Sequence, residues 1–578
     1  MTTPFRSLVC VLLAAVGAAT AAAAPAPADL LIRNGMVFDG LGGKPYLGQV
    51  AIKGDRITYV GPQRRIKSKA TIDANGLAIA PGFINMLAHP EESLFADGRA
   101  LSDLMQGVTL EVLGEDSMGP LNPTMQRKMA ERQGDIRYPV TWTTLGGYLS
   151  GLQHKGISPN LASYVSAGTV RHYVLGEGDV QPSPEQLQAM RALVRQSMEE
   201  GALGVTTALI YSPNGYARTP ELIALAEESA KCGGIYSAHM RSEGDRIEAA
   251  LAETIAIAKA SGAPAHIYHL KQAGKDNWGK LDQVIATIEG ARAQGTRITA
   301  DMYTYTAGAT GLDAAMPPWV QDGGLEQWIA RLRQPELRAK VLADMRIAHP
   351  GNWENLLGAS GPEGTVLLQF KNPKLKPLIG KSLAQVARER GVSPEDAAID
   401  LVIEDGTRVG IAYFLMNEEN VRRQTALPWV SFDSDEAAYA PEGVFLQTGA
   451  HPRAYGSFAR LFAQYVRHDK ALSIQEAVRK LTSLSADTLS LPLRGRLKSG
   501  AFADVIVFDP ATIQDHATYD KPHQLATGVR EVIVNGKAAV RNGVATGAAT
   551  GRVVRGRAAI VDGGACKAAA GDWTWSPT

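Results

Sequence analysis

The sequence predicts an α/β protein in which a (β/α)8 barrel carries an insertion and is joined to a small β-sandwich built from both chain ends. Two observations predict this architecture. Over about 350 central residues, short apolar segments alternate with amphipathic helical stretches, which is typical of parallel strands joined by helices. Both ends of the chain instead contain short alternating strands separated by glycine turns.

The predicted sandwich combines segments that lie far apart in the chain. Alternating apolar residues and glycine-containing turns occur at residues 29–61, 71–80, 494–510 and 531–543. We assign residues 25–80 and 487–550 to the sandwich and residues 81–486 to the barrel. Residues 551–578, rich in Gly and Ala, form a C-terminal tail without an assigned role.

Strand-like and helix-like segments alternate through the predicted barrel. The predicted strands are residues 81–89, 107–116, 138–144, 163–167, 201–213, 235–238, 265–268, 297–305 and 427–436, of which 138–144 and 163–167 are the weakest. The clear helical stretches are residues 184–200, 220–231, 248–262, 280–294 and 473–487. Residues 308–400 interrupt the alternation, so we expect an insertion packed as a lid or subdomain. A surface elaboration without a role in substrate binding is the alternative.

Two of the barrel strands each lead into a histidine. Residues 235–238 precede His239 and residues 265–268 precede His269, with one helix between the strands. Parallel strands joined by a helix place their corresponding ends side by side, so both imidazoles are expected at one edge. Two neutral imidazoles suit a zinc-type ion, although a single histidine at a strand end is more often structural.

Other strands of the predicted barrel also end in polar residues, at the face where such barrels hold their active sites. The candidate metal ligands and acids are His89, Glu115, Asp116, His239, His269 and Asp435. Such a set can hold one metal ion and a water, whose pKa the metal would lower toward about 7. Asp435 would take the water's proton and pass it to a leaving nitrogen. Lys271 and Arg453 would bind a substrate carboxylate.

Several of these residues also have a structural interpretation. His89 could cap a turn after its strand, and Asp433-Ser434-Asp435 could form a solvated turn. Tyr303 could be a packing residue, although its strand end faces the same mouth. These alternatives stay open on the sequence alone.

Composition narrows the classes of partner and compartment. Lys and Arg number 59 against 58 Asp and Glu, so no charge bias favours nucleic acid. The chain has 3 cysteines, too few for a disulfide framework; Cys10 lies in the leader, and Cys232 and Cys566 could pair, although no local feature indicates it. Residues 1–24 contain Arg6, an apolar run and small residues, which predicts a secretory signal peptide. We therefore expect a periplasmic or secreted protein with no stable membrane span after cleavage; an uncleaved anchor is the alternative.

A set of longer motifs resembles one enzyme family. The motifs are APGFINMLAH (80–89), GVTLEVLGE (107–115), YSAHMRSEG (236–244), HLKQAGKDNWGK (269–280), SFDSD (431–435) and HPRAYGSF (451–458). Over residues 29–551 the chain resembles the N-acyl-D-amino acid deacylases of the metal-dependent amidohydrolase superfamily. The resemblance implies a distorted (β/α)8 barrel with a β-sandwich, zinc bound by His239 and His269, and Asp435 as catalytic acid/base. It also implies a substrate site lined by Tyr211, Lys271, Tyr303 and Arg453.

The chain departs from the family pattern at two expected metal positions. The family usually has His-x-His after the first strand, whereas Leu87 replaces the first histidine here and only His89 remains. D-aminoacylases place a metal-binding cysteine after the second strand, where this chain has Glu115 and Asp116. Because leucine cannot bind a metal, we expect one zinc ion per chain. Of the two carboxylates we prefer Glu115 as the ligand, although straight spacing puts Asp116 in the place of the cysteine.

The sequence therefore predicts a zinc-dependent hydrolase of N-acyl amino acids, of D configuration if the resemblance extends to the substrate. It would release a carboxylate and a free amine. The first alternative is the same machinery acting on another amide, such as an aryl amide or an unusual peptide bond. The second is a degenerate binding protein without catalysis, because two family ligands are missing. Retention of His239, His269, Lys271 and Asp435 argues against the second alternative.

Overall fold

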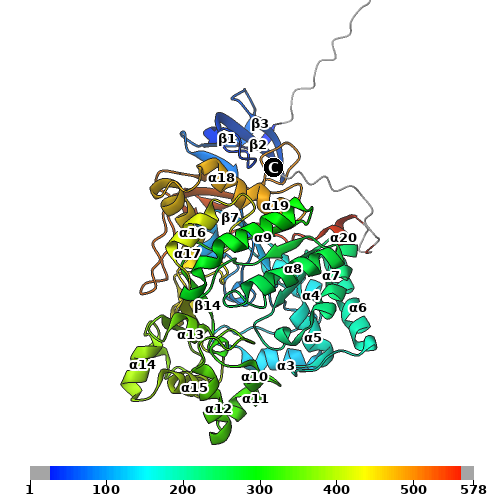
Figure 1. The fold of residues 1–578 in the computed structure, drawn as a ribbon. Coiled ribbons are helices and arrows are strands. Elements are labelled where there is room, and N and C mark those ends of the chain that lie inside the picture. The colour runs from blue at the N-terminus through cyan, green and yellow to red at the C-terminus, as the bar shows by residue number, and fades with distance from the viewer. Residues whose placement is uncertain (1–26, 562–565, 567–578) are drawn as a thin grey trace, which may run out of the picture.

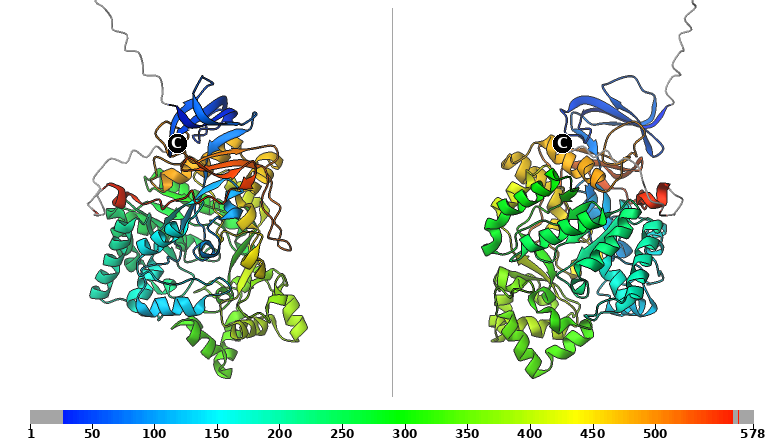
Figure 2. Two further views of the ribbon diagram at one scale, coloured as in Figure 1. Left: turned by 180° about the vertical axis from the view of Figure 1, so that it is seen from behind. Right: turned by 45° about the vertical axis from the view of Figure 1, so that its right-hand side comes forward.

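The computed structural model describes residues 27–561 and Cys566. The predicted signal peptide, residues 1–24, and the end of the predicted tail lie outside the described residues. Strands β1, β2 and β3 lie at one end of the molecule, and the helices of the predicted insertion lie at the opposite end (Figures 1 and 2). An α/β body lies between these two ends.

Strands from both ends of the chain form one 9-stranded sheet. Its order is β20-β19-β18-β17-β5-β1-β2-β3, with β4 paired to β1. The bounds are β1 Ala28–Val37, β2 Tyr46–Lys53, β3 Arg56–Gly61, β4 Ser68–Asp73, β5 Ala78–Pro81, β17 Val505–Phe508, β18 Val529–Val534, β19 Lys537–Arg541 and β20 Val544–Ala545. The antiparallel pair β5 and β17 joins the two ends. Because the strands belong to one sheet, the predicted two-layered sandwich is not confirmed.

Strand β17 shows how this sheet attaches to the rest of the molecule. Side chains alternate between the two faces of a strand. Val505 and Val507 pack into a core within the sheet region, whereas Ile506 and Phe508 pack into the main core of the α/β body. All four side chains are fully buried. Each such burial stabilises the fold by about 1.5–3 kcal/mol. Because its two faces are buried in different cores, β17 joins the core of the sheet to the core of the body.

The α/β body contains two parallel sheets, ordered β6-β7-β8 and β13-β12-β11-β10-β9. Their bounds are β6 Phe83–Asn85, β7 Val108–Leu113, β8 Asn160–Ser163, β9 Val165–Ser166, β10 Gly204–Ala208, β11 Ile235–His239, β12 Ala265–Ile267 and β13 Ile298–Ala300. Seven of the predicted barrel strands are found here. The predicted strand 163–167 contains the short strand β9, and the other six are β6, β7 and β10–β13. Each has one or both ends trimmed, except that β11 extends to include His239. Neither sheet closes on itself.

Two predicted barrel strands are wrong. Residues 138–144 form no strand, because Tyr138 and Trp142 stack with Phe95 in an aromatic cluster. Residues 427–436 make only an isolated bridge, between Val430 and Ala300. This segment still connects the edges of the two parallel sheets, because the amide of Met86 donates to the carbonyl of Phe432 at 3.3 Å.

Helices cover the outside of the α/β body (Figure 1). They are α1 Ser93–Ala96, α2 Leu101–Leu104, α3 Pro123–Arg132, α4 Leu145–Lys155, α5 Ala167–Leu175, α6 Pro184–Glu200, α7 Thr219–Lys231, α8 Ile247–Ser261, α9 Leu281–Ala293, α16 Glu418–Thr425, α17 Arg453–Arg460, α18 Ile474–Arg479 and α19 Ser485–Thr488. The predicted helix 184–200 has the same bounds as α6, because Ser183 caps the helix immediately before Pro184 and forms a capping box with Gln186 in the first turn. Gly201, with φ +118°, ends it in the left-handed region.

The predicted insertion has its own sheet and core. The sheet order is β14-β16-β15, with β14 Ala307–Gly311, β15 Thr365–Gln369 and β16 Gly410–Phe414. Its helices are α10 Pro318–Gln321, α11 Leu325–Leu332, α12 Pro335–Met345, α13 Leu356–Ser360, α14 Leu383–Arg390 and α15 Pro394–Asp405. Strand β16 lies between β14 and β15, so this subdomain continues beyond the predicted end at residue 400 to Phe414.

The described part of the tail is attached to the body. The amide of Val554 donates to the carbonyl of Leu161 at 2.7 Å, and α20 follows at Arg557–Val561. Cys232 and Cys566 form a disulfide, with their Cα atoms 4.8 Å apart. Among the described residues, none of the helices combines the length and the apolar character that a membrane span requires.

Candidate active site

A cavity of about 770 Å³ lies at the carboxyl ends of the parallel strands. One wall comes from the α/β body and includes His89, Glu115 and His239. The opposite wall comes from the insertion and includes Thr310, Leu356 and Arg408. The insertion therefore closes one side of the place where the candidate residues gather.

His239 and His269 lie side by side at this edge. Strand β11 ends at His239, and β12 runs parallel to it with Ile267 opposite Ala238, as the sequence predicts. The two ring centroids are 4.6 Å apart. His269 has φ +36°, and its amide donates to Asp301 Oδ1 at 2.5 Å. A non-glycine residue keeps a positive φ only when surrounding contacts stabilise it. For His269, the hydrogen bond to Asp301 is such a contact.

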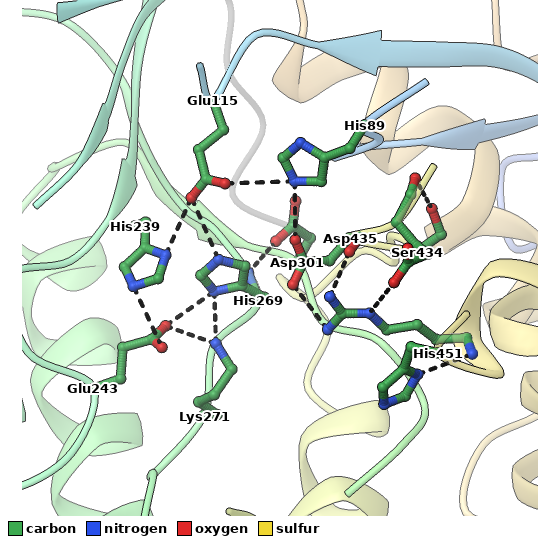
Figure 3. Close-up of polar contacts among 12 residues, drawn as sticks. His89, Glu115, His239, Glu243, His269, Lys271, Asp301, Ser434, Asp435 and His451 are labelled. Atoms are coloured by element: carbon green, nitrogen blue, oxygen red, sulfur yellow. Dashed lines mark hydrogen bonds and ion pairs between the residues drawn. The ribbon is translucent and has the colours of Figure 1, made fainter. Parts of the chain in front are cut away.

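Glu115 lies between the two histidines and His89 (Figure 3). Its Oε1 is 3.1 Å from His239 Nδ1 and 3.7 Å from His269 Nε2, and its Oε2 is 3.4 Å from His89 Nε2. Gly114, with φ +108°, makes this turn after β7, since a Cβ there would approach the carbonyl oxygen of Tyr164 to 2.5 Å. The chain can therefore direct Glu115 into the mouth only with glycine before it.

These side chains offer two overlapping sets of candidate metal-binding atoms. Ligand atoms of Glu115, His239 and His269 all lie within 4.8 Å of one another, and the same holds for His89, Glu115 and Asp435. His239 Nε2 is buried and has no hydrogen-bond partner among the described residues; Glu243 Oε2 lies 3.6 Å from it. Burial alone would raise the pKa of Glu115, but His239, His269 and His89 hold it well below its usual range. A buried carboxylate between imidazoles fits a zinc-type ion.

Asp435 faces His89 across the mouth. The residue has φ +46°, and its amide donates to the carbonyl of Leu87 at 3.0 Å. Its Oδ1 is 3.1 Å from His89 Nε2, and its Oδ2 is 2.9 Å from Arg453 Nη1. Burial would raise the pKa of Asp435, but Arg453, His269 and His89 outweigh burial and lower the pKa to about 2. Asp435 is therefore ionised at neutral pH.

Arg453 and Tyr303 lie together on the Asp435 side of the cavity. Arg453 begins α17, is 1% exposed, and donates to the carbonyl of Asp435 as well as pairing with its carboxylate. Its guanidinium carbon is 4.3 Å from the centre of the Tyr303 ring. The Tyr303 hydroxyl is buried and has no hydrogen-bond partner within residues 27–561, and both residues line the cavity.

The remaining predicted residues also line the cavity, in different surroundings. The Tyr211 ring centroid is 5.3 Å from that of His239. Lys271 Nζ is buried, 2.7 Å from Glu243 Oε1 and 2.7 Å from His269 Nδ1. Asp116 is exposed and belongs to neither set of metal-binding atoms, whereas Glu115 belongs to both.

Sequence reasoning missed Glu243 and Asp301. Glu243 Oε1 contacts both Lys271 Nζ and His269 Nδ1, the latter at 2.9 Å (Figure 3). Burial alone would raise its pKa, but Lys271 and the two histidines lower it well below the usual range. Glu243 follows the strand by four residues, where strand alternation no longer fixes direction. Its position in the YSAHMRSEG motif was the available signal. Asp301 directly follows β13, so its position at a strand end could have indicated a place in the site.

Leu87 occupies the position of the missing family histidine. Its side chain is fully buried in an apolar cluster with Met86 and Tyr268. The structure thus offers no ligand atom at this position, and His89 is left with Glu115 and Asp435.

Known proteins match the chain over most of its length. The Amidohydrolase family model matches residues 442–540. D-aminoacylase of Alcaligenes xylosoxydans xylosoxydans is 31% identical over 538 residues, which are 92% of this chain and 99% of the relative. A crystal structure of D-aminoacylase superposes with a TM-score of 0.76 at 30% identity, covering 92% of this chain and 100% of that chain. The N-acyl-D-glutamate deacylase of Bordetella bronchiseptica, solved with zinc and a phosphonate mimic of the tetrahedral intermediate, superposes with a TM-score of 0.74 at 26% identity over the same shares.

Proposed function

The chain belongs to the N-acyl-D-amino acid deacylase family of metal-dependent amidohydrolases, and we propose that it hydrolyses N-acyl-D-amino acids to a carboxylate and a free D-amino acid. The observation that carries this proposal is the juxtaposition of Glu115, His239 and His269 with the ionised Asp435 in one cavity. The zinc and the phosphonate in the related deacylase support the same type of reaction.

Zinc is the metal that we propose, one ion per chain, held by Glu115, His239 and His269. The fit rests on the donor set and on the buried Nε2 of His239, which neither accepts nor donates a hydrogen bond among the described residues and lies 3.6 Å from Glu243 Oε2. A zinc ion there supplies Lewis acidity, which lowers the pKa of water and polarises a carbonyl group. His89 would complete a weaker second set with Asp435, in which Leu87 contributes nothing.

Asp435 is the proposed general base and acid. Its carboxylate is held on one side by His89 and on the other by Arg453, so it points in a fixed direction. It would accept the proton of the attacking water and deliver that proton to the leaving nitrogen. The low pKa of Asp435 keeps the group ionised before attack.

Lys271, Tyr303 and Arg453 form the proposed site for the substrate's carboxylate. All three line the cavity, and two of them are cations. Arg453 already pairs with Asp435, so its binding role would be shared with the orientation of the base. Tyr211, beside His239 on the insertion side, would contact the substrate's acyl group or side chain.

The finer architecture and the location are part of the same proposal. We infer that β6–β13 and residues 427–435 act as one distorted (β/α)8 barrel over residues 81–486, with 25–80 and 487–550 as a β-module. The Cys232–Cys566 disulfide supports an oxidising compartment, which agrees with a signal peptide at residues 1–24 and with a periplasmic or secreted location.

The test combines metal content with turnover of a panel of N-acetyl-D- and N-acetyl-L-amino acids by the purified mature protein. We expect about one zinc per chain and D-selective hydrolysis that a chelator abolishes and zinc restores. Zinc without turnover of the panel, but with turnover of aryl amides or unusual peptides, would contradict the proposed substrate. Neither zinc nor turnover would favour a binding protein without catalysis.

A further inference from the structure

Glu354 of the insertion contacts the loop that follows β11. It lies between α12 and α13 and extends its carboxylate into the α/β body. Its Oε1 accepts hydrogen bonds from Ser242 Oγ at 2.5 Å and from the amides of Glu243 and Gly244, both at 2.7 Å. A single carboxylate oxygen therefore holds three consecutive residues of this loop.

This loop carries the side chain that contacts the proposed site. The backbone of Glu243 is held by Glu354, and its carboxylate contacts Lys271 Nζ and His269 Nδ1. The carbonyl of Glu243 also accepts from the amide of Ala273, at 2.8 Å. The position of Lys271, the proposed partner of the substrate's carboxylate, thus depends on two successive carboxylates, Glu354 and Glu243.

Residues in both the loop after β11 and the insertion allow Glu354 to reach its hydrogen-bond donors. Gly244 leaves room for it, since a Cβ there would lie 3.0 Å from the carbonyl oxygen of Ala273 and 3.3 Å from Glu354 Oε1. On the insertion side, Asn355 Nδ2 donates to the carbonyls of Met345 and Ile347 at 2.7 and 3.1 Å. The residue beside Glu354 is therefore fixed to the end of α12.

The arrangement carries an electrostatic cost that stability alone does not explain. Glu354 Oε2 is buried without a hydrogen-bond partner among the described residues, and the main charge that acts on this carboxylate is the negative charge of Glu243. Burial and the negative charge of Glu243 raise the pKa of Glu354. Burying a carboxylate beside a second carboxylate costs free energy. This cost indicates that the hydrogen bonds from Glu354 to the loop have a role other than stabilising the fold.

We propose that Glu354 is a positioning residue through which the insertion orders Ser242–Gly244 and thereby sets Glu243 and Lys271 for binding the substrate's carboxylate. The inference rests on the proposed function and assigns the insertion a role beyond covering the cavity. It treats Glu354 as acting through Glu243 and not as touching substrate.

The experiment uses the full mature chain loaded with zinc and compares Glu354→Ala, Glu354→Gln, Glu243→Gln and the double variant Glu354→Ala/Glu243→Gln. We expect Glu354→Ala to lower kcat/KM about 10–100-fold, mostly through KM, because supporting contacts of this kind have effects of that size. Glu354→Gln keeps an oxygen that accepts the same three hydrogen bonds, so it should stay within about threefold of wild type. In the Glu243→Gln background, Glu354→Ala should add little, since the two residues act in series.

Hydrogen exchange of a peptide covering residues 240–246 gives a readout that needs no substrate. Glu354→Ala should speed exchange in this peptide. The matched control Glu404→Ala breaks an exposed pair with Arg390 on the same subdomain and should change neither exchange nor kcat/KM. Unchanged exchange in Glu354→Ala, equal damage by Ala and Gln, or full additivity with Glu243→Gln would each overturn the inference. A zinc-loaded wild type without turnover would contradict the proposed function instead, and the exchange measurement would still decide the role of Glu354.

Discussion

The two sides of the cavity mouth differ in the number and burial of the side chains that could bind a metal ion. On one side, which we term the histidine-pair side, Glu115, His239 and His269 are buried and are further contacted by Glu243 and Lys271. On the other, which we term the Asp435 side, the His89 side chain is 31% exposed and is accompanied by Asp435 and Arg453. Leu87, two residues before His89 in the chain, is buried in an apolar cluster.

This difference separates two tasks that one mouth must perform. The histidine-pair side has a compact set of donors in a low-dielectric setting, which favours a tightly held metal ion. The Asp435 side has an ionised carboxylate oriented by a cation and an imidazole, which favours proton transfer. The contrast therefore assigns metal binding to one side and proton transfer to the other, and variants on each side should fail in different ways.

The largest effect is expected from His239→Ala on the histidine-pair side. Removing one of the three proposed ligands should eliminate stoichiometric zinc and lower kcat/KM at least about a thousandfold, because a bound metal would supply the main activation. Metal analysis and turnover after gel filtration check both effects. His468→Ala, at a histidine whose side chain is 78% exposed, is the control and should match wild type. Normal zinc content in His239→Ala would break the comparison.

The next effect is expected from Asp435→Asn on the other side. The amide has nearly the same shape but cannot take a proton, so kcat should fall about 10²–10⁴-fold while zinc stays bound. Steady-state kinetics and metal content of one preparation measure this separation. Asp282→Asn, at an exposed residue that does not line the cavity, serves as the control. Turnover near the wild-type rate, or loss of zinc together with activity, would contradict the division of tasks.

The sequence was sufficient for features that depend on local patterns. Helix α6 has capping residues at both ends, and the strands before His239 and His269 have regular apolar patterns, so their bounds and their parallel pairing could be predicted. Segment 138–144 has the composition of a strand, but Tyr138 and Trp142 pack against Phe95, and only the tertiary context reveals this.

The parts of the site that could not be predicted depend on loops and on long-range contacts. Glu243 lies beyond its strand and meets Lys271 through a turn that Glu354, more than 100 residues later in the chain, holds in place. Strand alternation carries no information about such a turn. The pairing of Cys232 with Cys566 likewise depends on the path of the tail and not on any motif around either cysteine.

The smallest effect on catalysis, and the sharpest test of the contrast, is expected from Leu87→His. An imidazole would replace a fully buried leucine, so without zinc the melting temperature should fall, because an unbonded polar group is placed in an apolar cluster. With excess zinc the loss should be recovered in part, and the bound zinc should rise above the wild-type amount, since a ligand that binds only the folded state stabilises it.

Leu87→Gln, polar but a poor zinc ligand, should lose stability without recovery. Because Asp435 and the histidine pair are untouched, kcat should change less than about tenfold in Leu87→His. If zinc raised neither the melting temperature nor the metal content of Leu87→His above those of Leu87→Gln, a histidine at position 87 would not create a second metal site. The Asp435 side would then differ from the histidine-pair side in more than Leu87.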